Sequence, residues 1–142
     1  MDIKLIVAAI GIVGILASAF VQFVLGRLAE KNKKAHEIRT QAYLDLINSV
    51  SDIASTSKFN EGKIEPNQLK NLTSAKSRVV LIGSDDVVIQ IHKYFLAYEK
   101  LDSNESYDAF SNIVSAMRKD LISKSNLEQT LLTEALFGKD KN

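Results

Sequence analysis

The side chains of this 142-residue chain that could carry chemistry are few and widely separated. Its two histidines, His36 and His92, have no glutamate three residues before them, the spacing that supplies iron ligands in helical bundles. Cysteine is absent, which excludes disulfides, zinc–thiolate sites and thiol catalysis. Neither a phosphate-binding glycine loop nor a Gly-x-Ser-x-Gly elbow occurs. The sequence therefore predicts no enzyme, no cofactor and no metal site.

Asp85 and Asp86 form the one adjacent pair of carboxylates that follows a turn sequence. They come after Gly83 and Ser84, where a catalytic or metal-binding pair is one interpretation. Ser84 is also a favoured residue before the first turn of a helix, and acidic side chains in that turn interact well with the helix dipole. Capping accounts for all three residues, and we predict that role.

Three arginines, Arg39, Arg78 and Arg118, lie in or beside the apolar stripes of their expected helices. A guanidinium in such a place must reach water or a carboxylate, because burying an unpaired charge is costly. The candidate carboxylates are Asp45, Asp52, Asp86 and Asp120. The first interpretation is that ion pairs fix the register of the helices. The second is that the arginines line a cleft for a small anionic ligand.

The element that dominates the sequence is the stretch from Leu5 to Leu25, which has no charged residue over 21 positions. As a helix it is roughly 32 Å long, close to the hydrocarbon thickness of a bilayer. A surface helix of a soluble protein has only an apolar stripe. We therefore expect a transmembrane anchor over residues 1–26. A signal peptide cleaved after Ala17-Ser18-Ala19 is the alternative, but the apolar run continues beyond that site.

A basic segment follows the anchor at once. Residues 27–39 carry five Lys or Arg against two Glu, whereas only Lys4 precedes the anchor. This bias predicts a single-pass protein of the cell inner (cytoplasmic) membrane, with the N-terminus outside and the C-terminal domain cytoplasmic. The basic stalk, residues 27–40, is expected to contact lipid headgroups. The net charge of +1 argues against a nucleic-acid partner.

Within the anchor, small or polar residues recur at spacings of three and four and so share one helix face. Such a face allows close approach of helices, and the amide of Gln22 could bond across it. It predicts a homo-oligomer, although Gly and Ser are also common in membrane helices. The residues are Gly11, Gly14, Ser18 and Gln22.

The rest of the chain predicts an all-α fold, in which the transmembrane helix continues into a bundle of four to five helices over residues 41–138. Neither Pro nor Gly interrupts residues 27–54, and residues 55–67 read as a loop. Two further helices are expected from Pro66 to Gly83 and from Ser84 to Leu101. A fourth follows the break at residues 101–106 and runs from Tyr107 to Leu121, and a short last helix runs from an N-cap at Ser125 to Gly138. A charged tail fills 139–142.

Short motifs mark this chain: Arg39 before Ala42-Tyr43 and Leu46, the segment Gly83 to Val87, and the segment Met117 to Leu121. With the single span and polar stalk, they resemble small uncharacterised bacterial membrane proteins that have one span and a helical cytoplasmic domain. The resemblance implies the architecture and assigns no activity. We expect a membrane-anchored, non-enzymatic interaction or scaffold protein that binds a partner protein or itself. The alternative is a membrane-bound sensor or effector with an anionic ligand in an arginine-lined cleft.

Overall fold

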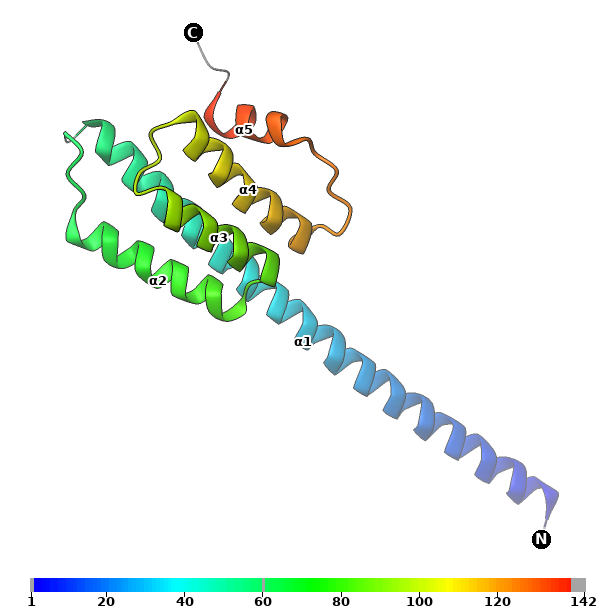
Figure 1. The fold of residues 1–142 in the computed structure, drawn as a ribbon. Helices are drawn as coiled ribbons and strands as arrows, with labels where there is room; N and C mark the ends of the chain where they lie inside the picture. The colour runs from blue at the N-terminus through cyan, green and yellow to red at the C-terminus, as the bar shows by residue number, and fades with distance from the viewer. Residues whose placement is uncertain (1, 60, 139–142) are drawn as a thin grey trace. The chain divides into compact units, whose positions relative to one another are not determined.

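The computed structural model describes residues 2–59 and 61–138, and within these ranges all regular structure is helical. The predicted all-α fold class is therefore confirmed (Figure 1). The predicted charged tail, 139–142, lies outside the described residues. The five described helices are α1 (Ile3–Phe59), α2 (Pro66–Ile82), α3 (Asp85–Ala97), α4 (Asn104–Leu121) and α5 (Gln129–Phe137).

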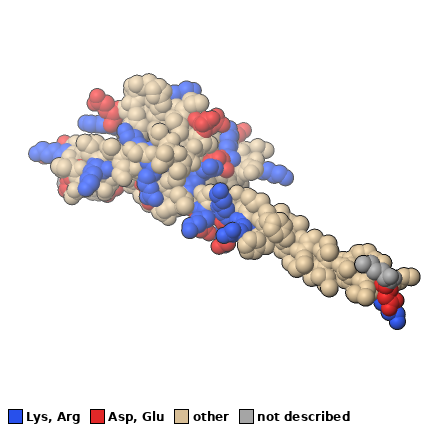
Figure 2. All heavy atoms as spheres, turned by 90° about the horizontal axis from the view of Figure 1, so that it is seen from below, with Lys and Arg blue, Asp and Glu red and all other residues tan. Residues whose placement is uncertain are grey.

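Helix α1 contains 57 residues and passes without a break from the apolar stretch into the bundle, as predicted. Two compact units divide at Glu37 and Ile38, slightly before the expected start of the bundle at residue 41. In the first unit α1 is long and apolar enough to cross a membrane, and none of its most apolar window is buried against protein. Figure 2 shows this stretch free of charged atoms, which appear at both of its ends.

The second unit, from Ile38 onward, has one hydrophobic core to which all five helices contribute. Helix α4 packs against α3 and α5, and α2 packs against α3. Tyr43, Leu46, Val79, Val87 and Ile113 are essentially inaccessible to solvent. The apolar stripes at 3.6-residue spacing predict these positions, because each stripe must be covered by another helix.

Local signals place the helix starts in the second unit. Pro66 is the first residue of α2, where its missing N–H costs nothing. The Ser84 hydroxyl accepts from the backbone N–H of Val87, so the predicted cap of α3 is confirmed, with Asp85 and Asp86 in its first turn. Ser103 caps α4 in the same manner, accepting from Ser106.

Several predicted boundaries are wrong. Helix α1 continues to Phe59, so residues 55–59, expected as the start of the loop, are helical. Helix α5 begins at Gln129 after Glu128, so Ser125 does not cap it; its hydroxyl accepts from Arg118 Nε at 3.3 Å instead. Helix α3 ends at Ala97, so Leu101 lies in the α3–α4 connection rather than on a helix face. Ser125 thus bonds to a side chain of the preceding helix, and Leu101 packs against the core from the α3–α4 connection.

Candidate functional site

A polar network joins α1, the α2–α3 turn and α4 in the second unit. Arg39 donates from Nε to the carbonyl of Ile82 at 3.0 Å and from Nη1 to the Asp120 carboxylate at 3.3 Å. The Tyr43 hydroxyl donates to Asp120 Oδ2 at 2.6 Å and accepts from the backbone N–H of Ser84 at 3.1 Å. We call this set, Arg39, Tyr43, Ile82, Ser84 and Asp120, the junction network.

Tyr43 and the Asp120 carboxylate lie mostly out of water, which strengthens the hydrogen bond between them, whereas the Arg39 side chain is 38% exposed. Tyr43 is 1% exposed and the Asp120 side chain 14% exposed. Burial, followed by the hydrogen bond to Asp120, raises the pKa of Tyr43, so its hydroxyl stays protonated at neutral pH. The network therefore holds the first turn of α1 in the bundle to α4 and to the α2–α3 turn.

The other two predicted arginines have partners of their own. Arg78 Nη1 lies 2.6 Å from Asp45 Oδ2 on the surface, with half of the arginine side chain exposed. Arg118 donates to Ser125. The three arginines thus have different partners. Arg39 and Arg78 each pair with a carboxylate of another helix segment, as the helix-register interpretation expects, whereas Arg118 bonds to a serine. These contacts give no support to a shared anionic cleft, which stays a prediction that we do not carry further.

Gln68 is a polar anchor that the sequence analysis missed. It is buried at the start of α2, where its Oε1 accepts from the backbone N–H of Glu65. Its Nε2 donates to Thr56 Oγ1 at 2.8 Å and to Asp52 Oδ2 at 3.2 Å. The glutamine three residues after the N-cap was the available sequence signal, because this spacing occurs in capping boxes.

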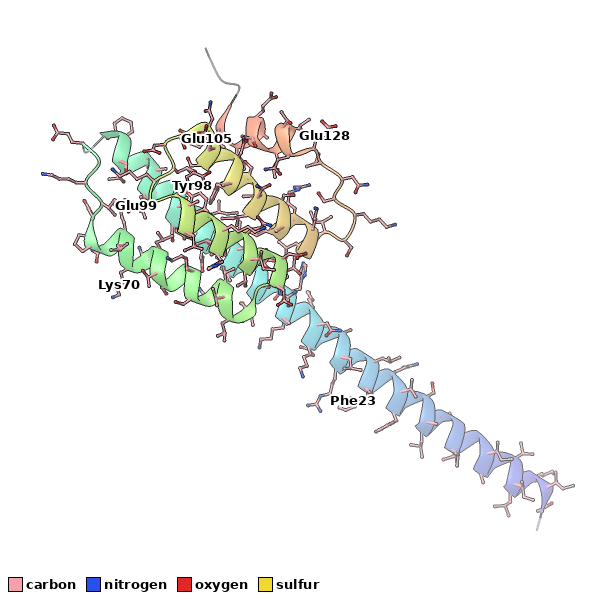
Figure 3. All side chains as sticks on the ribbon, in the orientation of Figure 1. Phe23, Lys70, Tyr98, Glu99, Glu105 and Glu128 are labelled. Carbon is pink, nitrogen blue, oxygen red and sulfur yellow. The ribbon has the colours of Figure 1, made fainter. Side chains whose placement is uncertain are left out.

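The predicted oligomerisation face of α1 is open in the single chain. An added Cβ would meet nothing within 4 Å at Gly11 or Gly14. At the basic end of the apolar stretch the Arg27 guanidinium lies 5.2 Å from the ring centre of Phe23, labelled in Figure 3. Pairing through Gly11, Gly14, Ser18 and Gln22 stays a prediction.

Among the described residues, no group of three or more His, Cys, Asp or Glu is placed to hold a metal ion. His36 lies in the first unit and His92 is exposed on α3. Asp85 and Asp86 are exposed in the first turn of α3, where capping explains their presence.

A cavity of about 380 Å³ opens at the end of the bundle where α1 finishes. We call it the end cavity. Its walls come from α1, the α1–α2 loop, α2, α3, the α3–α4 connection and α4. Most of its lining is apolar, including Val50, Ile53, Leu72 and Phe95. None of the three predicted arginines lines it.

The chain matches no protein-family model, and it has no significant match among curated proteins or solved structures. Its function is therefore inferred from its own surfaces and contacts.

Proposed function

We propose that this chain is a single-pass protein of the cytoplasmic membrane, without catalytic activity, whose bundle binds a helix of a partner protein. The observation that carries the proposal is an exposed ridge on α2. Leu69, Thr73, Ser77 and Leu81 follow one another at intervals of four residues, and all four are exposed. We call these four residues the α2 ridge.

The α2 ridge has a large apolar side chain at each end. Leu69 is 56% exposed and Leu81 82% exposed, and neighbouring Val80 is 54% exposed. Rows of side chains four residues apart are the ridges that pack into the grooves of another helix. Leucines left in water on such a row favour a second helix, because burying each contributes about 1.5–3 kcal/mol.

The two side chains in the middle of the α2 ridge, Thr73 and Ser77, are small, and their hydroxyl groups already donate hydrogen bonds within α2. Thr73 Oγ1 donates to the carbonyl of Leu69, and Ser77 Oγ donates to the carbonyl of Thr73, both at 2.9 Å. Since these hydroxyl protons already have acceptors in their own helix, covering them costs little. Small side chains between two leucines also let a partner helix approach closely.

The apolar stretch of α1 supports the membrane location. Its large side chains are exposed, among them Leu16 at 65% and Phe20 at 68%. A protein in water rarely leaves such an extended apolar surface uncovered, whereas a bilayer covers it. The basic residues that follow support a cytoplasmic bundle.

A site-specific photocrosslinker tests the proposal on the full chain in its membrane. Benzoylphenylalanine at Ser77 should give one dominant adduct with another protein, and the same group at exposed Asn112 on α4 should give none. Leu81→Glu should abolish the Ser77 adduct. Equal crosslinking at both positions, or none at Ser77, would contradict the proposal. An adduct between two differently tagged copies of this chain would show that the α2 ridge binds a second copy rather than another protein.

A further inference from the structure

The end cavity is large enough for a small organic molecule. Its volume of about 380 Å³ is more than twice the 150 Å³ or so that holds benzene in an engineered apolar cavity. It also falls within the range of about 300–1,000 Å³ found for ligand pockets. Apolar walls with a few polar groups are typical of such pockets.

One polar side chain that lines the end cavity has no hydrogen-bond partner among the described residues. Tyr94 lines the cavity and is 4% exposed, yet its hydroxyl makes no hydrogen bond to any described residue. Every inaccessible side-chain oxygen or nitrogen of the described residues has a partner, so this hydroxyl must be accessible. Because Tyr94 lines the cavity, we take this accessible hydroxyl as the group to which a ligand there bonds.

The ring of Tyr94 is held in place by its neighbours. Ring centres of Phe95, Tyr98 and Phe110 lie 5.0, 5.7 and 5.9 Å from that of Tyr94. Aromatic contacts at these separations stabilise one ring position. A ligand that bonds to the hydroxyl therefore does not incur the entropic cost of ordering a mobile side chain.

The rim of the end cavity is acidic on balance. Among the described side chains that line it, Glu99 and Asp102 contribute two carboxylates from the α3–α4 connection and Lys100 one ammonium. Lys100 Nζ lies over the α1–α2 loop, 3.9 Å from the position of an added Cβ at Gly62. Figure 3 labels Tyr98 and Glu99 at this end of the bundle.

We propose that the end cavity binds a small amine with an aromatic or branched apolar body. The body packs against Val50, Ile53 and Leu72, the amine bonds to the Tyr94 hydroxyl, and the rim carboxylates favour its positive charge. Of the described side chains that line the cavity, Lys100 alone would favour a carboxylic acid of the same size, and both carboxylates would oppose it. The proposal goes beyond the proposed function, because no residue of the α2 ridge lines the cavity.

Three indoles with a two-carbon side chain test the ligand class: tryptamine, tryptophol and indole-3-acetate. The chain has no tryptophan, so indole fluorescence reports the probe once the signal of the nanodisc belt protein, measured without probe, is subtracted. The full chain is held in phosphatidylcholine nanodiscs, and empty nanodiscs measure partition into lipid. Tryptamine should bind at least about fivefold more tightly than indole-3-acetate, the ratio that one partly exposed charge interaction gives. Equal affinities for the three probes, or no binding above empty nanodiscs, would overturn the proposal.

Two substitutions locate the binding groups. Asp102→Asn should weaken tryptamine about threefold to fivefold and leave tryptophol unchanged, since only the charge is lost. Tyr94→Phe should weaken both tryptamine and tryptophol. The matched control is Glu105→Gln, an exposed carboxylate in the first turn of α4 that does not line the cavity. An effect of Glu105→Gln equal to that of Asp102→Asn would contradict binding in the end cavity.

Discussion

At the scale of single residues, Asp120 accepts hydrogen bonds from both Arg39 and Tyr43, so its charge supports two contacts at once. We expect Asp120→Asn to lower the free energy of unfolding of the bundle by about 1–3 kcal/mol, because Arg39 loses its carboxylate partner. Chemical denaturation followed by circular dichroism measures it. The matched control is Asp45→Asn, which breaks the more exposed pair with Arg78 and should cost less than about 1 kcal/mol. Equal losses in the two variants would show that the junction network adds nothing beyond a surface ion pair.

Tyr94 makes the stability of the bundle sensitive to alkaline pH. Burial, and next the charge of Asp102, raises the pKa of Tyr94 to about 12 from an ordinary value of 10.0. The folded state therefore holds this proton more tightly than the unfolded chain does. Its contribution is fully present below pH 10 and is lost as the pH rises through about 12.

Tyr94→Phe should remove that part of the alkaline loss of stability, about 1–3 kcal/mol. It should change stability at pH 7 little, because the hydroxyl bonds to none of the described residues. Denaturation at pH 7 and pH 11.5, together with the tyrosinate absorbance, checks both statements. Tyr43 has a raised pKa as well, so some alkaline loss will remain. An alkaline loss in the variant as large as in the unchanged chain would contradict the assignment.

At the scale of elements, Gly83 is required where α2 gives way to α3. A Cβ there would lie 2.6 Å from the Val79 carbonyl oxygen and 3.3 Å from Tyr43 Cε1. Gly83→Ala should destabilise the bundle by about 1–3 kcal/mol, because the turn must shift away from Tyr43 and disturb the junction network. Thermal unfolding of the full chain in nanodiscs measures the change. Gly26→Ala is the control, since a Cβ there meets nothing within 4 Å and bundle stability should stay the same.

At the scale of the whole molecule, the position of the basic residues predicts which side of the membrane holds the bundle. Green fluorescent protein fused after Asn142 should fluoresce, and alkaline phosphatase at the same place should be inactive, because this charge bias predicts a cytoplasmic bundle. Replacing the basic residues of the stalk with Gln should reduce this preference. Phosphatase activity with the unchanged stalk would contradict the predicted orientation.

The sequence by itself determined the elements that depend on neighbours along the chain. The apolar stretch, the unbroken α1, the start of α2 at Pro66 and the Ser84 cap follow from periodicity, charge and capping. Such features need only residues within a few turns of one another. For the same reason the core faces of α3, α4 and the bundle part of α1 could be predicted from their apolar stripes. In α2 and α5 the stripe was only partly right, because Leu69, Val80, Leu131 and Leu136 are exposed although their spacing groups them with core residues.

Only the tertiary structure decided which residues meet. Arg39 and Asp120 are 81 positions apart, and four aspartates were candidates for the arginines, so sequence spacing could not select the pairs. The end cavity likewise depends on where the α1–α2 loop and the α3–α4 connection lie. The spacing of apolar residues in α3 indicated that Tyr94 is a core residue, but not that its hydroxyl bonds to none of the described residues. These features arise from packing between distant segments, which a one-dimensional pattern does not contain.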